Sequence, residues 1–205
     1  MIVLASASPR RRTLLEQAGL RFDVDPADVD ETCETTAPAE EVALVLAERK
    51  ALAVAARHAP DVWVVGADTV VALGASDTDG GKLLGKPASI EDAREMLRAL
   101  SETRHRVVTG VSVVRGGSRG ALSAYETTWV TMRAIADAEI EAYAVSGEWE
   151  GKAGGYATQE SADAFVTRLE GGFDNVVGLP VALTLGLLRS AGAVLPTVAR
   201  EGLRG

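Results

Sequence analysis

A long apolar run from Asp61 to Leu73 limits the possible folds more than any other stretch of the sequence. It reads DVWVVGADTVVAL, and its length and β-branched residues predict a central, largely buried strand. Asp68 interrupts the run, and a buried carboxylate is costly unless it is paired or binds a metal. We therefore predict a general base or metal ligand at Asp68, the alternative being a carboxylate that caps a neighbouring turn. Gly66 indicates either a bulge or a ligand close to the backbone.

The N-terminal stretch predicts a strand, a tight turn and a helix. The apolar residues 2–4 form the strand, Ser8 suits the N-cap, and Pro9 suits the first helical position. Arg10 and Arg11 then fall in the first turn, where the helix dipole and free N–H groups favour an anion. This arrangement favours a bound phosphate, and the alternative is a solvated basic surface turn.

The overall charge narrows the class of ligand. The 205 residues carry 21 basic and 29 acidic side chains, a net charge of −8, which argues against binding to polymeric nucleic acid. A local group of cations therefore indicates a small anionic ligand. We expect a single domain over residues 1–199 with a polar tail at 200–205, no signal peptide, no membrane span and a cytoplasmic location. The lone Cys33 excludes an internal disulfide, and with two histidines a Cys/His zinc site is hard to assemble.

The segments before and after the long run add charged candidates. The acidic stretch from Asp23 to Glu34 predicts a loop in which one or two carboxylates bind a divalent cation, or else a solvated acidic loop. Residues 38–58 predict one amphipathic helix, with Lys50 on its solvent-facing side. Lys86, between Gly85 and Pro87, is either aimed at a fixed anion or part of a surface turn.

The remaining sequence predicts scaffold and one recognition loop. The loop from Gly147 to Gly155, next to an aromatic residue and an amide, is typical of recognition of a planar base. The expected scaffold comprises a hairpin tip at 74–81, a helix from Ser89 through Leu100, antiparallel strands at 106–115 and 121–133, a helix at 137–145 and a last helix ending at Leu188.

Taken together, these stretches resemble the Maf family of nucleoside triphosphate pyrophosphatases over nearly the whole chain. The motifs that carry the resemblance are Ser6-Ala7-Ser8-Pro9-Arg10-Arg11, Asp30-Glu31, Arg49-Lys50-Ala51, Gly66-Ala67-Asp68-Thr69, Gly85-Lys86-Pro87, Gly151-Lys152-Ala153-Gly154-Gly155-Tyr156 and Asn175-Val176-Val177-Gly178-Leu179-Pro180. The resemblance implies an α/β fold with a mixed elongated sheet flanked by helices and two lobes around a central cleft, similar to inosine triphosphatase. It also implies a homodimer.

The resemblance implies cleavage of a nucleoside triphosphate between its α and β phosphates, with Mg²⁺, Mn²⁺ or Co²⁺ as cofactor. Asp68 would be the general base, and Glu31 and Asp68 would hold the metal. Arg10, Arg11, Lys50 and Lys86 would form the phosphate clamp, with Lys50 and Lys86 also acting in catalysis. The substrate-binding residues would be Ser6, Ser8, Arg10, Arg11, Thr69 and Gln159.

Two details favour the branch of the family that acts on dTTP and UTP: the arginine after Pro9 and the Ala-Gly-Gly-Tyr segment followed by Gln159. Residues 156–160 read Tyr-Ala-Thr-Gln-Glu, where the family usually has Tyr-Gly-Ile-Gln-Gly. One alternative function is a nucleotide-binding regulator of septum formation that does not turn its ligand over. Another is a sugar-nucleotide transferase, which would need a second acceptor pocket.

Overall fold

The computed structural model describes residues 1–31, 37–74, 82–157 and 161–195. The hairpin tip at 75–81, Cys33, Gln159 and the polar tail, about which the sequence makes predictions, lie outside these residues. Within the described ranges the strands are β1 (Ile2–Leu4), β2 (Asp23–Val24), β3 (Trp63–Leu73), β4 (Lys82–Leu84), β5 (Arg104–Arg115), β6 (Ala121–Met132) and β7 (Val166–Glu170). The helices are α1 (Pro9–Gln17), α2 (Ala39–Ala55), α3 (Ile90–Leu100), α4 (Asp137–Ser146), α5 (Phe173–Val177) and α6 (Val181–Ser190), with short 3₁₀ helices η1 (Ala153–Gly155) and η2 (Ser161–Phe165).

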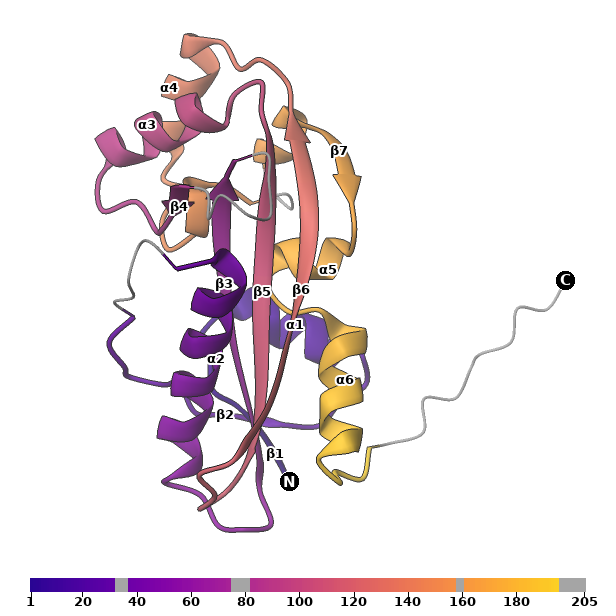
Figure 1. Cartoon of the computed structure of the whole chain (residues 1–205). Coiled ribbons are helices and arrows are strands. Elements are labelled where there is room, and N and C mark those ends of the chain that lie inside the picture. The colour runs from indigo at the N-terminus through magenta and orange to yellow at the C-terminus, as the bar shows by residue number, and fades with distance from the viewer. Residues whose placement is uncertain (32–36, 75–81, 158–160, 196–205) are drawn as a thin grey trace, which may run out of the picture.

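These strands form one mixed sheet in the order β2-β1-β3-β5-β6-β7, with β4 also paired to β3. β1 runs parallel to β2 and β3, whereas β3, β5 and β6 are antiparallel neighbours. β3 is central and largely buried, as its apolar run predicts. In Figure 1 the long strands β3, β5 and β6 run the length of the molecule, with α3 and α4 at one end and α1, α2 and α6 around the other. The mixed, elongated sheet with flanking helices confirms the predicted fold class.

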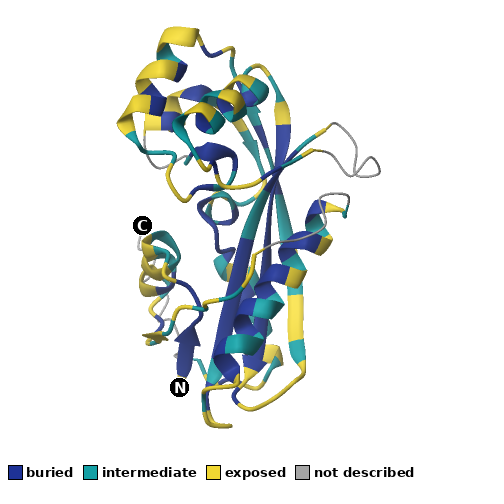
Figure 2. Cartoon of the chain, turned by 90° about the vertical axis from the view of Figure 1, so that its left-hand side faces the viewer, coloured by how far each residue is buried: buried dark blue, intermediate teal, exposed yellow. Residues whose placement is uncertain are grey.

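The apolar core is divided between the two ends of the sheet. At one end, residues of β3, β5 and β6 pack with α3, α4 and Phe165. At the other end, α1 and α6 cover one face of the sheet and α2 covers the opposite face. Figure 2 shows the buried residues concentrated along the long strands, with exposed residues on the outer sides of the helices. The region between the two packed ends is where side chains from both can meet.

The start of α1 follows the prediction closely. Pro9 is the first helical residue, and the Ser8 hydroxyl at the N-cap accepts a hydrogen bond from the Arg11 amide at 3.5 Å. Ser89 caps α3 in the same way, accepting from the Asp92 amide at 3.1 Å. The acidic stretch, predicted to be a loop, contributes the short strand β2, because Asp23 and Val24 pair with β1.

Gly66 has a different role from either predicted one. A Cβ atom there would lie 2.3 Å from the Ala47 carbonyl oxygen, and at Gly110 on β5 it would lie 2.3 Å from the Ala43 carbonyl oxygen. The prediction of a bulge or a ligand at Gly66 is therefore wrong: the backbone of α2 occupies this space. The two glycines bring α2 directly onto the sheet, which sets the position of Lys50.

Candidate active site

A break in strand pairing along β3 positions the site. β1 pairs with Trp63 to Val65 and β4 pairs with Val71 to Leu73 on the same edge of the sheet. Between them, no strand among the described residues pairs this edge of β3. A cavity of about 610 Å³ opens here, lined by Asp68 and Thr69 together with residues from both ends of the molecule. Because successive side chains of a strand point to opposite faces, the open edge lets both faces of β3 contribute to one cavity.

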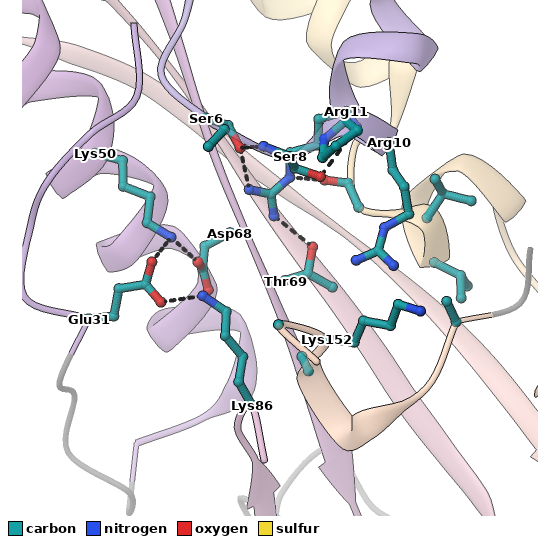
Figure 3. A pocket seen from close by; sticks show the side chains of 18 of the residues that line it. Ser6, Ser8, Arg10, Arg11, Glu31, Lys50, Asp68, Thr69, Lys86 and Lys152 are labelled. Atoms are coloured by element: carbon teal, nitrogen blue, oxygen red, sulfur yellow. Dashed lines mark hydrogen bonds and ion pairs between the residues drawn. The ribbon is translucent and has the colours of Figure 1, made fainter. Parts of the chain in front are cut away.

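Asp68, Glu31 and two lysines form a charged cluster on one side of the cavity (Figure 3). The Lys50 ammonium lies 2.5 Å from Asp68 Oδ1 and 2.8 Å from Glu31 Oε1, and Lys86 Nζ lies 2.6 Å from Glu31 Oε2. Partial burial of Glu31 opposes ionisation, but the two lysines outweigh it and lower the pKa of Glu31 to about 2. Ammonium and carboxylate groups therefore alternate in the cluster. A polyanion could replace the carboxylates on the lysines, and a cation could replace the lysines on the carboxylates.

Lys50 corrects one sequence prediction. Lys50 is only 7% exposed and lies on the face of α2 that packs against the sheet, so the prediction that it faces solvent is wrong. The ammonium group is tolerated there because two carboxylates surround it. The neighbouring Arg49 donates to the Asp30 carbonyl oxygen, which holds the backbone next to Glu31 against α2.

Arg11 is built into the opposite wall of the cavity. Its Nε donates to the Gly178 carbonyl at 2.8 Å, and its Nη1 donates to the Ala67 carbonyl at 2.8 Å and to Ser6 Oγ at 3.2 Å. Its Nη2 donates to Thr69 Oγ1 at 3.1 Å. Among the described residues these bonds use four of the five N–H groups of the guanidinium, which leaves one for a ligand. Burial lowers the pKa of Arg11, against the attraction of Asp68.

The serines of the first turn support this arrangement. Ser6 Oγ accepts from the Ser8 amide at 3.3 Å as well as from Arg11, and Ser8 caps the helix that carries Arg11. Both serines line the cavity. They therefore shape the turn and also form part of the cavity surface.

Arg10 and Lys152 extend from opposite walls toward the same part of the cavity (Figure 3). Lys152 is 8% exposed and stands just before η1. The motif around Lys152 is part of the family resemblance, but the sequence did not indicate a role for this residue. A lysine directly after a glycine, the same arrangement as Gly85 and Lys86, was the available signal.

Gly178 is a further residue whose role the sequence did not indicate. Its φ is +122°, and a Cβ atom would lie 3.4 Å from both Arg11 Nε and Thr69 Oγ1. A side chain here would strain the backbone and crowd the guanidinium. The motif from Asn175 to Pro180 therefore serves to bring a carbonyl to Arg11. Gln159, predicted to bind substrate, lies outside the described residues.

The carboxylates suit a divalent cation only in part. Asp68 and Glu31 converge on a single ammonium group and offer hard oxygen donors, which Mg²⁺ prefers. The described residues contain no group of three or more His, Cys, Asp and Glu side chains that could hold a metal. The residues therefore fit an ion that is bound by one or two carboxylates and takes its other ligands from water and phosphate, as Mg²⁺ commonly does.

The fold and the cavity define a mixed α/β protein with a cleft that can hold a small phosphorylated ligand between cations and carboxylates. Across the described residues, no helix has the length and apolar character needed to cross a membrane. The family model "Maf-like protein" matches residues 1–191, and the chain belongs to this family.

Relatives called dTTP/UTP pyrophosphatase match almost the entire chain. The dTTP/UTP pyrophosphatase of Anaeromyxobacter dehalogenans is 50% identical over 197 residues, covering 95% of this chain and 96% of the relative. The dTTP/UTP pyrophosphatase of Pelotomaculum thermopropionicum is 48% identical over 191 residues, covering 93% and 96%. A dITP/XTP pyrophosphatase structure from Mycobacterium abscessus aligns with a TM-score of 0.38 at 17% identity, covering 64% of this chain and 72% of that one.

Proposed function

We propose that this protein is a nucleoside triphosphate pyrophosphatase that hydrolyses dTTP and UTP to the monophosphate and pyrophosphate. The observation that carries the proposal is the buried Asp68 carboxylate, which faces a cation-lined cavity at the open edge of β3. The names of the relatives at 50% and 48% identity support the same reaction and the same two substrates.

The surroundings of Asp68 support its proposed role as the general base. Within the described residues its hydrogen bond to Lys50 uses Oδ1, which leaves Oδ2 to accept a proton. In the proposed reaction, water attacks the α phosphorus, its proton passes to Asp68, and the bond from the α phosphorus to the bridging oxygen breaks. Pyrophosphate leaves with the electron pair of that bond, so atoms and charge balance.

The cations would stabilise the negative charge that develops on the leaving pyrophosphate. Lys50 and Lys86 each contact Glu31 in the free protein, so phosphate oxygens would replace the Glu31 carboxylate on at least one of them. Arg10 would bind phosphate directly, while Arg11 has one N–H left for the ligand. Ser6, Ser8, Thr69 and Gln159 would complete the substrate site.

Glu31 and Asp68 would hold a divalent cation, which we propose to be Mg²⁺, with Mn²⁺ or Co²⁺ as substitutes. When bound, such an ion neutralises phosphate charge and makes a nearby water more acidic. Separation of Glu31 from Lys50 and Lys86, and of Asp68 Oδ1 from Lys50, would free one oxygen of each carboxylate for this role and leave Asp68 Oδ2 for the proton. We also propose a homodimer and a cytoplasmic location, which sedimentation and cell fractionation would test.

Pyrophosphate release from dTTP, UTP, CTP, GTP and 7-methyl-GTP with Mg²⁺ tests the function. We expect release from dTTP and UTP, and a loss of at least 100-fold in Asp68→Asn, because the amide cannot take the proton. Glu150→Gln is the control, since Glu150 also lines the cavity and the substitution removes the same charge. Retained binding with no release from any triphosphate would favour the regulator of septum formation instead.

A further inference from the structure

A line of hydroxyl groups leads from the cavity wall into the protein interior. Arg11 Nη2 donates to Thr69 Oγ1 at 3.1 Å, Thr69 Oγ1 lies 2.9 Å from Thr109 Oγ1, and Thr109 Oγ1 donates to the Asn175 carbonyl at 2.9 Å. Thr69 and Thr109 are direct partners in the pairing of β3 with β5. Thr109 is fully buried and does not line the cavity, whereas Thr69 does.

The direction of every hydrogen bond in this line follows from its two ends. A carbonyl oxygen can only accept, so the single hydroxyl proton of Thr109 is used on Asn175. Thr109 must then accept from Thr69, which uses the single proton of Thr69. At the other end, a guanidinium can only donate, so Thr69 accepts from Arg11. Thr69 therefore has only lone pairs to offer to anything in the cavity.

An acceptor at Thr69 excludes a phosphate oxygen as its partner, because phosphate oxygens at neutral pH are acceptors as well. Beside it, Arg11 has one N–H group left for a ligand. The cavity thus presents one acceptor next to one donor at this point. The nucleoside part of a substrate has groups that can donate to Thr69: the N3–H of uracil or thymine, or a sugar hydroxyl.

We propose that Thr109 is a positioning residue that keeps Thr69 an acceptor, so that Thr69 receives an N–H or O–H group of the nucleoside and not a phosphate oxygen. The proposal rests on the proposed function, which supplies the nucleotide. Since dTTP lacks a 2′ hydroxyl, a sugar donor would be the 3′ hydroxyl. Cytosine carries a lone pair on N3 where uracil carries a proton, so the two sources can be separated by ligand choice.

Thr109→Val tests the proposal with little disturbance of the structure. Valine has nearly the same shape, and the Asn175 carbonyl keeps a second donor, the Gly178 amide at 3.1 Å. In this variant Thr69 still accepts the hydrogen bond from Arg11. Its hydroxyl proton no longer has Thr109 as an acceptor and can turn toward the cavity. Thr109→Ser restores the hydroxyl, and Thr184→Val makes the same change at a fully buried threonine of α6.

Calorimetric binding of UMP, CMP and 3′-deoxy-UMP to the full chain gives a readout that does not depend on turnover. In the wild type we expect at least tenfold weaker binding of either CMP, if the donor is N3–H, or 3′-deoxy-UMP, if it is the 3′ hydroxyl. If the donor is N3–H, Thr109→Val should reduce the ratio of the CMP and UMP dissociation constants to about threefold or less, because the freed hydroxyl proton of Thr69 can donate to N3 of cytosine. If the donor is the 3′ hydroxyl, Thr109→Val should weaken the binding of UMP but not that of 3′-deoxy-UMP, so the ratio of their dissociation constants should fall. Thr109→Ser and Thr184→Val should keep the wild-type ratio.

The proposal is overturned if the wild type distinguishes neither CMP nor 3′-deoxy-UMP from UMP, or if folded Thr109→Val keeps the wild-type ratio. It is also overturned if Thr109→Val weakens all three ligands equally, because a purely structural residue would act in this way. Absence of triphosphate turnover in the wild type would refute the proposed function, while the monophosphate ratios would still decide the role of Thr109.

Discussion

Replacement of Arg11 by lysine keeps the positive charge but removes the planar guanidinium group, whose hydrogen bonds hold the cavity wall together. Arg11 makes hydrogen bonds to four acceptors: the carbonyls of Ala67 and Gly178 and the hydroxyls of Ser6 and Thr69. A lysine ammonium donates from a single point and cannot reach acceptors arranged around a planar fork. At least two of these bonds should be lost.

The expected cost follows from the value of each bond. A hydrogen bond to a charged group contributes about 1.5 kcal/mol at the lower end of its range, so the loss of two lowers the free energy of unfolding by about 3 kcal/mol. For a domain of this size, that corresponds to a decrease of about 6–12 °C in Tm. Urea denaturation and thermal melting of Arg11→Lys would measure both quantities.

Arg10→Lys is the matched control. Arg10 is the neighbouring residue and also lines the cavity, but within the described residues its guanidinium makes no ion pair or hydrogen bond to the protein. This variant should unfold at the wild-type urea concentration and raise KM for the nucleotide. If Arg11→Lys has the same unfolding midpoint as Arg10→Lys, the argument that Arg11 holds the cavity wall together is refuted.

Three further predictions concern packing and charge. Gly66→Ala should destabilise the protein by at least about 3 kcal/mol or prevent folding, because the new Cβ would meet the backbone of α2; Gly85→Ala, with open space at its Cβ, should melt like the wild type. Burial lowers the pKa of His105 to about 4, whereas the imidazole of the unfolded chain titrates near 6.5. As the pH falls from about 6.5 to 4, protonation therefore stabilises the unfolded chain, and the free energy of unfolding should decrease by up to about 3 kcal/mol. Urea denaturation should find this decrease absent in His105→Gln, and equal pH slopes would contradict the assignment. Lys50→Met should raise the pKa of Glu31 from about 2 toward its ordinary value, measured by carboxyl ¹³C titration; an unchanged pKa would show that Lys50 does not hold it down.

The local elements were predictable because their signals are contained in short stretches. The apolar run of β3 and the Ser8-Pro9 start of α1 follow from strand propensity and helix capping. The strands on either side of the turn at 116–117 follow from their turn chemistry. β2 and β7 were not predicted: each is short, and its pairing partner is distant in the sequence.

The site was predictable in its residue types but not in its contacts. Motif resemblance named Glu31, Lys50, Asp68 and Lys86, and the structure brings these side chains into one cluster. The same resemblance assigned Arg11 to the phosphate clamp and to the substrate-binding residues. It could not indicate that most of the Arg11 donors are used by the protein itself.

The sequence by itself determined where the long strands and most of the helices form, that a carboxylate interrupts the apolar run of β3, and which charged residues are available for a phosphorylated ligand. Only the tertiary structure decided that Lys50 is buried, that Gly66 receives a helix, and that Thr109 sets the hydrogen bonding of Thr69. The physical reason is distance along the chain. Helix caps and strand patterns depend on neighbours a few residues away, whereas these contacts join segments whose relative position is set by the register of β3 with its partners.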